Sequence, residues 1–154
     1  MMKIALIIFV VLTVSGVLAF VAMGIHSRGG SAPGMRAMAL QSCGSRPNCV
    51  WSGASPNNTQ HVAGFAFDAG EEDGAWTGLI EAIRTAGGKL EQNSPPYLNA
   101  TFSSKVFGFV DDFECLIDRD TGVIHLRSSA RVGYSDRNVN RARVEQIRAM
   151  LNKR

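Results

Sequence analysis

The sequence predicts an α+β domain in which an antiparallel β-meander packs against two helices as a two-layer sandwich, preceded by one N-terminal transmembrane helix. Three observations predict this architecture: an uninterrupted apolar run near the N-terminus, two amphipathic helical segments, and runs rich in Val, Ile and Phe between them. The chain has 154 residues, of which 45% are hydrophobic, so it fits one globular domain with an appendage.

The appendage is the apolar run from Ile4 to Ile25, which follows Lys3 and contains no charged residue. At 1.5 Å per residue, a helix over this run is roughly 33 Å long, enough to cross a hydrocarbon core of about 30 Å. A cleaved signal peptide has a shorter apolar core, typically about 7–15 residues, and a small-residue cleavage site. We therefore predict a retained membrane anchor over residues 1–25, with a cleaved signal as the alternative.

The segment after the anchor, residues 26–41, is rich in Gly, Ser and Ala and predicts a flexible tether to a globular domain over residues 42–154. The basic residues on the two sides of the anchor do not fix its orientation. Single N-terminal anchors usually leave the following domain outside the cytoplasm. We expect a single-pass protein of the inner (cytoplasmic) membrane with a periplasmic C-terminal domain.

Charge is unevenly distributed along the chain. Residues 37–126 carry 5 Lys and Arg against 11 Asp and Glu, a net charge of −6, whereas residues 127–154 carry 8 against 2, a net charge of +6. The simpler interpretation is that the acidic body and the basic end pack together; the alternative is a basic face toward an anionic lipid or ligand. Nucleic acid is not an expected partner, because no aromatic platform interleaves the basic residues.

Two segments have helical periodicity. The first, "DGAWTGLIEAIRTAGG", is expected to begin with Asp73 as its cap and to end at Gly87 and Gly88. The second closes the chain, with Asn138 or Asn140 as its expected cap. The apolar stripes of the two helices are Trp76, Leu79, Ile80 and Ile83 in the first, and Val144, Ile147 and Leu151 in the second.

A β-hairpin is predicted between these helices. The sequence "DRDTG" separates two runs of strand-forming residues, which indicates a tight turn with Gly122 at a positive φ. If the hairpin is symmetric about Asp120, Asp111 lies opposite Ser129 and diagonal to the arginines on either side of that serine.

Strand alternation places Arg127, Ser129 and Arg131 on the face that points away from the helices. Together with Asp111, they form either a structural ion-pair ladder that fixes the register or an anion pocket. In the second case, Arg127 and Arg131 bind a carboxylate or phosphate and Tyr134 closes one side.

The chain contains three cysteines. Cys43 and Cys49 flank a Pro-containing turn and are predicted to form a disulfide in an oxidising compartment. Cys115 lies within a predicted strand and is interpreted as a small buried hydrophobe. We predict no metal site, because zinc would need further ligands, and His61 and Cys115 are too distant in sequence to supply them. A Cys115–His125 nucleophile is disfavoured by its position within the hairpin strands.

Three stretches carry a family resemblance: "SRPNCV", "FGFVDDFE" and "RSSARVGYSDRNVNRARVEQIR". Over residues 42–152 the chain resembles the bacterial and plastid domain-of-unknown-function family 1499. The matching residues are Cys43, Pro47, Asn48, Cys49, Val50, Phe109, Asp111, Asp112, Arg127, Ser128, Arg131, Gly133, Ser135, Asp136, Asn140 and Arg141.

The sequence departs from the family pattern at two places. Arg46 stands where Ser is usual, and Ser129-Ala130 replace Ala-Ser, which argues against a reactive serine at position 130. The resemblance implies an anchored or exported domain of unresolved function.

The sequence contains no G-x-S-x-G elbow, phosphate-binding Gly loop or H-E-x-x-H motif. We therefore favour a non-enzymatic accessory or binding domain without cofactors, whose partner is an anionic small molecule, a lipid headgroup or an envelope protein. The alternative is an envelope-acting hydrolase that uses Asp111 or Asp112 as base, with Arg127 and Arg131 stabilising an oxyanion. Adjacent strand residues point to opposite faces, so Asp111 and Asp112 cannot form a simple dyad.

Overall fold

The computed structural model of the protein describes residues 2–153. Its helices are α1 (Met2–Arg28), α2 (Glu72–Thr85) and α3 (Val139–Leu151). Its strands are β1 (Met35–Arg36), β2 (Ala39–Leu40), β3 (Cys49–Trp51), β4 (Phe65–Ala66), β5 (Lys89–Ser94), β6 (Tyr97–Ser103), β7 (Val110–Asp118) and β8 (Val123–Ala130).

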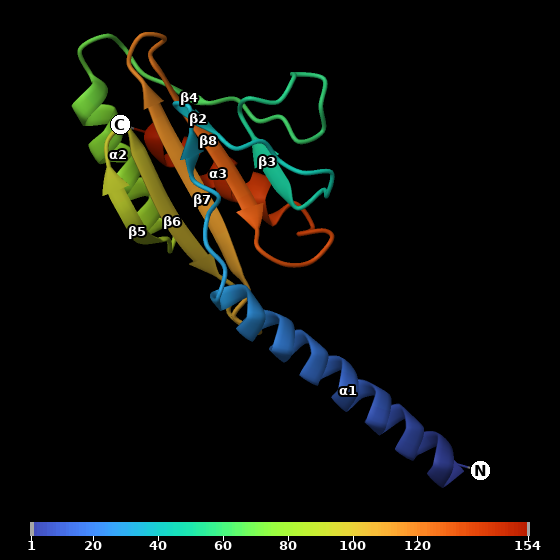
Figure 1. Ribbon diagram of the computed structural model, residues 1–154. Helices are drawn as coiled ribbons and strands as arrows, with labels where there is room; N and C mark the ends of the chain where they lie inside the picture. Colours follow the sequence, from blue (N-terminus) through green and yellow to red (C-terminus); the bar gives the residue numbers. More distant parts are fainter. Residues whose placement is uncertain (1, 154) are drawn as a thin grey trace.

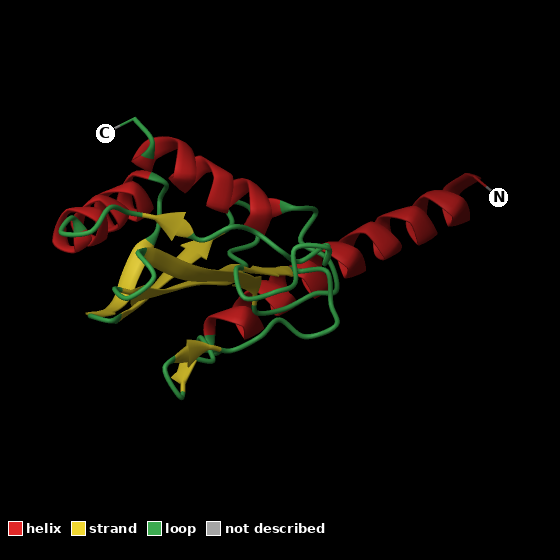
Figure 2. Cartoon of the chain, turned by 90° about the horizontal axis from the view of Figure 1, so that it is seen from above, coloured by secondary structure: helices red, strands yellow, loops and turns green. Residues whose placement is uncertain are grey.

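An antiparallel sheet forms the centre of the domain (Figure 1). Its strands follow the order β3-β8-β7-β6-β5, and β4 pairs with the other end of β8. Helices α2 and α3 cover one face of this sheet, while the small β1–β2 hairpin lies over the other (Figure 2). This arrangement confirms the predicted α+β fold, with a meander of β5 to β8 packed against two helices and preceded by a long apolar helix.

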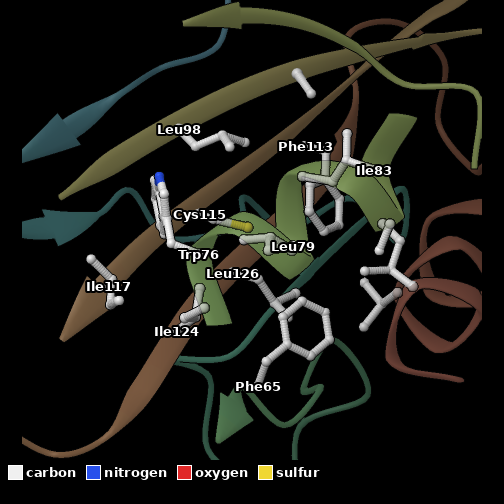
Figure 3. Packing of buried hydrophobic residues seen from close by; sticks show 14 of the residues in the cluster. Phe65, Trp76, Leu79, Ile83, Leu98, Phe113, Cys115, Ile117, Ile124 and Leu126 are labelled. Atoms are coloured by element: carbon white, nitrogen blue, oxygen red, sulfur yellow. The ribbon is translucent and has the colours of Figure 1, made fainter. Parts of the chain in front are cut away.

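The hydrophobic core lies between the sheet and the two helices (Figure 3). Leu79 and Ile83 on α2 are fully buried, as the predicted helical stripe requires, and Ile80 packs at the edge of the core. Phe113 and Leu126 enter the core from β7 and β8, because alternate residues of a strand point to the same face.

The start of α2 differs from the one expected. Asp73 does not cap α2: the helix begins at Glu72, so Asp73 lies in its first turn, and Glu71 occupies the N-cap position. Gly87 follows the last turn with a φ of +91°, a conformation that glycine adopts without strain, and the predicted end of the helix is confirmed.

Asn138, one of the two residues expected to cap α3, lies at its N-cap position, but another side chain makes the capping hydrogen bonds. Asn138 occupies the N-cap position at a φ of +65°, and its side chain makes no capping hydrogen bond among the described residues. Instead, the Asp136 carboxylate accepts hydrogen bonds from the backbone N–H groups of Asn138 (3.1 Å) and Asn140 (2.8 Å). Asn140 itself is fully buried within the helix.

Residues 29–41, which we name the strap, cross the face of the sheet that the helices leave uncovered. They contain the β1–β2 hairpin, and Leu40 packs into a small buried cluster with Tyr97 and Leu116. The Gly34 N–H donates a hydrogen bond of 2.8 Å to Oε1 of Glu114. The segment predicted to be a flexible tether thus follows the surface of the domain in this structure.

Helix α1 projects away from the domain (Figure 1). Its most apolar window has a mean hydropathy of 3.0, and none of that window is buried against the rest of the protein. By length and composition, α1 is able to cross a membrane.

Candidate functional site

The register of the β7–β8 hairpin determines which charges meet on the sheet. Asp112 lies opposite Ser129, Glu114 opposite Arg127, and Asp111 opposite Ala130. The predicted register, with Asp111 opposite Ser129, is therefore wrong by one residue. In the observed register Asp112, and not Asp111, shares a face with the arginines, because a shift of one residue moves every side chain of the strand to the other face.

The turn explains the difference. Asp118 pairs with Val123, so four residues form the loop, where a turn symmetric about Asp120 leaves an odd number. The Asp118 carboxylate accepts hydrogen bonds from the N–H groups of Asp120 (3.0 Å) and Thr121 (3.3 Å), which stabilises the longer turn. Gly122 has a φ of +67°, as predicted.

Arg127 forms a buried ion pair with Glu114. Its Nη1 donates to Oε2 of Glu114 over 2.9 Å, and the Glu114 side chain is fully buried. The Tyr97 hydroxyl donates to Oε1 over 2.7 Å, alongside the Gly34 N–H. Burial, followed by the hydrogen bond to Glu114, raises the pKa of Tyr97, so the phenol keeps its proton and serves as a donor.

Arg131 forms a second pair one step along the same face. Its Nε and Nη2 donate to the two carboxylate oxygens of Asp112 over 2.9 and 2.7 Å, a bidentate contact. Its Nη1 also donates to the Ser27 carbonyl at the end of α1. The hydrogen bond to Asp112 is the main reason that the pKa of Arg131 is raised.

Asp111 lies on the opposite, helix-covered face. Its Oδ2 accepts a hydrogen bond of 2.7 Å from Nη2 of Arg143, and the guanidinium carbon of Arg143 lies 4.4 Å from the centre of the Phe102 ring. Arg143 also donates to Asn140 and to the Ser128 hydroxyl. Burial raises the pKa of Asp111, and the charge of Arg143 only partly opposes this effect.

The predicted site residues are therefore divided between two faces. Arg127, Ser129 and Arg131 share a face, as predicted, whereas Asp111 does not join them. Ser129 is buried, and Tyr134 is 73% exposed. Arg127 and Arg131 each bind a carboxylate of the acidic body, which favours the ion-pair ladder and the packing of the basic end against that body. Binding of a ligand by these residues stays a prediction.

The strap lines two hollows on this face of the sheet, one near each of its ends. The hollow nearer α1 is a polar groove of about 430 Å³. It is lined by Arg28, Gly30, Ser31, Lys89, Glu91, Asn99, Thr101, Ser103, Val110 and Arg131. We call it the proximal groove.

The proximal groove contains a cation without a carboxylate partner among the described residues, an ion pair and a buried amide oxygen. Arg28 takes part in none of the ion pairs of residues 2–153, whereas Lys89 is paired with Glu91 at 3.1 Å. The Thr101 hydroxyl and Lys89 lower the pKa of Glu91, which is therefore ionised. The Oδ1 atom of Asn99 is buried and accepts no hydrogen bond from the described residues. The groove thus offers an uncompensated cation and an unused acceptor.

The second hollow, of about 610 Å³, lies at the C-terminal end of the strap and is mostly apolar, with Leu40, Trp51 and Leu116 among its lining residues. His125 lines it too, with Nδ1 at 3.4 Å from the Ser52 hydroxyl and Nε2 at 3.9 Å from Asp118. The second distance exceeds a hydrogen bond, so these residues do not form an oriented catalytic triad.

The geometry also bears on the alternative chemistries. Asp111 and Asp112 point to opposite faces, and each is bound to an arginine, so they cannot act together on one substrate. Cys115 lies opposite Leu126 on the core face, whereas His125 points to the other face, so the two do not meet. Cys115 is fully buried, and burial raises the pKa of its thiol. Among residues 2–153, no group of three His, Cys, Asp or Glu side chains is placed to hold a metal ion.

Sequence reasoning missed Glu114 and Arg143, the buried partners of Arg127 and Asp111. The sequence does contain a signal for Glu114. A turn symmetric about Asp120 would place the Glu114 charge on the core face, which is unfavourable, whereas a shift of one residue places it opposite Arg127. Arg143 carries no such signal, because its partner belongs to a strand distant in sequence.

The first prediction concerns the buried pair. Replacement R127M leaves the Glu114 carboxylate buried without its main partner and is expected to lower the free energy of unfolding by about 3–5 kcal/mol. The double variant R127M/E114Q should recover part of this loss, because the unpaired charge is gone. Urea denaturation of the full-length protein in detergent measures both.

The matched control is the exposed Arg137, where R137M should change the free energy of unfolding by no more than about 0.5 kcal/mol. A loss in R127M as small as that of the control means that the pair does not support the fold.

The second prediction concerns pH. A carboxyl group whose folded-state pKa is raised stabilises the fold below its ordinary pKa of 3.8, and this contribution is lost as pH rises through the folded-state pKa. The wild type should therefore lose stability relative to D111N as pH rises from about 3 to 7. The difference between their free energies of unfolding isolates Asp111, because other groups titrate in both proteins. A difference that grows in favour of the wild type would show that Arg143 outweighs burial.

Comparison with known proteins finds one family. The family described as "Protein of unknown function (DUF1499)" matches residues 39–151, which include the strands of the main sheet together with α2 and α3. Neither a curated protein nor a solved structure matches the chain. The match covers more than half of the sequence and agrees with the resemblance carried by the motifs, so the chain belongs to the DUF1499 family.

Proposed function

We propose that this protein is a membrane-anchored, non-catalytic binding domain whose proximal groove holds the headgroup of an anionic phospholipid. The observation that carries this proposal is that the uncompensated Arg28 and the unpartnered Oδ1 of Asn99 belong to residues that line one groove at the end of α1. The other cations that line the groove, Lys89 and Arg131, already hold carboxylates, so their charges are largely compensated and Arg28 is the cation left to bind an anion.

The membrane supplies the proposed ligand at the required position. If α1 crosses the inner membrane as a single span, Arg28 lies just beyond its apolar run, at the level of the headgroups. A phosphate there would accept hydrogen bonds from the guanidinium group of Arg28. A headgroup hydroxyl would donate to Asn99, which satisfies its buried oxygen.

We further propose that the folded domain is periplasmic. The bridge between Cys43 and Cys49, whose Cα atoms are 5.7 Å apart, supports this location, because disulfides persist in oxidising compartments. The buried Cys115 is compatible with the same environment, because burial shields its thiol from oxidants.

The third prediction tests the groove. Full-length protein in detergent is titrated with phosphatidylglycerol or phosphatidylcholine and observed by native mass spectrometry. The wild type should bind phosphatidylglycerol more tightly, and R28Q should weaken this binding about tenfold, since a hydrogen bond to a charged group contributes about 1.5–3 kcal/mol.

The matched control is R36Q, which removes the same charge from an exposed strap residue outside the groove lining and should leave binding unchanged. Added inorganic phosphate separates two sources of the ligand: displacement of the lipid by phosphate alone identifies a free-anion site. Equal binding by R28Q and the wild type would refute the proximal groove as the site.

The fourth prediction concerns the cysteines. Full-length protein purified from the membrane without reductant should show a mass lower by two hydrogen atoms than the fully reduced chain, and reductant should restore the difference. Loss of this bridge, whose cysteines are separated by 6 positions, should lower the free energy of unfolding by about 2 kcal/mol. Free thiols at both positions in the native protein would argue against the proposed location.

A further inference from the structure

The loop between β6 and β7, residues 104–109, carries an exposed apolar tip. Val106 is 82% exposed, and Phe107 and Phe109 are half-buried on its C-terminal side. Lys105 precedes this tip, so an apolar group and a cation stand side by side in one short loop. Val106 is continuous with the neighbouring Phe107 and Phe109 rings, and contiguous exposed apolar surface marks interaction sites.

This loop packs directly on α1. The ring of Phe107 stacks on Phe20 with centroids 5.2 Å apart, and the ring of Phe109 meets Phe20 edge-on at 6.2 Å. Gly24 allows the close approach, because a Cβ atom at this position would overlap the Phe107 carbonyl. Loop and helix are therefore fitted to each other at a position that tolerates only glycine.

Hydrogen bonds extend this junction into the sheet. The Val110 N–H donates to the Ser27 hydroxyl over 3.0 Å, and that hydroxyl donates to the Gly24 carbonyl. Arg131, already bound to Asp112, donates to the Ser27 carbonyl over 3.2 Å. The last two turns of α1 are thus attached to β7 and to the ion-pair ladder.

The contact between Phe107 and Phe20 determines where the loop lies along the axis of α1. Phe20 lies five residues before Ile25, where the apolar run ends, and at 1.5 Å per residue this places Phe20 about 7.5 Å inside that end. The loop contacts the helix at this level through Phe107, while Gly108 lies against the Arg28 guanidinium nearer the end of α1. Figure 1 shows the loop at the end of the domain from which α1 emerges.

We propose that residues 105–109 enter the outer edge of the lipid bilayer beside α1, so that the domain meets the membrane through two elements. Val106, Phe107 and Phe109 contact the upper acyl chains, and their apolar surface is continuous with that of α1. Lys105 extends its ammonium group to the headgroup phosphates. The inference rests on the proposed membrane anchor and is independent of ligand binding in the proximal groove.

The fifth prediction tests this insertion in full-length protein embedded in phospholipid nanodiscs. V106C introduces an accessible thiol, because Cys43 and Cys49 are bridged and Cys115 is fully buried, and it is labelled with an environment-sensitive fluorophore. The label should be quenched several-fold more by spin-labelled lipid than by aqueous iodide. The matched control, V139C at the start of α3, should show the reverse preference.

A label at T13C, in the middle of the apolar run, separates the two proposals. Lipid quenching at position 13 with aqueous quenching at position 106 would overturn the loop insertion and leave the anchor intact. Aqueous quenching at both positions would overturn the anchor and the insertion together. Finally, G24V should displace the loop from α1 and transfer the label at position 106 to water; an unchanged signal would refute the proposed docking.

Discussion

Glu114 places a carboxylate in the middle of the sheet, where its side chain is fully buried, and the surrounding structure supplies its donors. Arg127 comes from the adjacent strand, the Tyr97 hydroxyl from the strand on the other side, and the Gly34 N–H from the strap. A buried charge without partners destabilises a fold by several kcal/mol, so these three contacts are coupled. The registers of β6, β7 and β8 and the position of the strap all depend on this one carboxylate.

The two faces of the sheet consequently differ in chemistry. The helix-covered face buries Leu98, Phe113 and Leu126, and the ion pair of Asp111 with Arg143 lies on it near the start of α3. The strap-covered face contains the ladder of charges and both hollows. A narrow strap covers less of a sheet than a pair of helices does, so solvent reaches polar side chains on either side of it. The fold therefore leaves space for a ligand on the strap-covered face.

Much of the fold follows from local patterns in the sequence. The apolar period of Trp76, Leu79 and Ile83 predicts α2, and the position of Gly122 predicts the β7–β8 turn, because both signals lie within a few neighbouring residues. The register requires a further argument, since one loop residue decides whether Asp111 or Asp112 faces the arginines.

The candidate site was less predictable than the fold. The proximal groove joins Arg28, Asn99 and Arg131, which come from three distant parts of the chain and share no local pattern. The strap was expected to lie apart from the domain because its composition is that of a linker. Its contacts with Glu114 and Leu116 arise from tertiary packing alone. The arginines were recognised correctly as a shared face, but their partners depend on the register.

The order of the cysteines along the chain has a consequence for biogenesis. A chain that enters an oxidising compartment from its N-terminus presents Cys43 and Cys49 well before Cys115. Closing the short loop between the first two loses less chain entropy than joining either of them to the third. Once β7 has paired with β6 and β8, Cys115 is fully enclosed. If the domain is exported, as proposed, synthesis order and burial together disfavour mispairing of its three thiols, so its export would depend little on a disulfide isomerase.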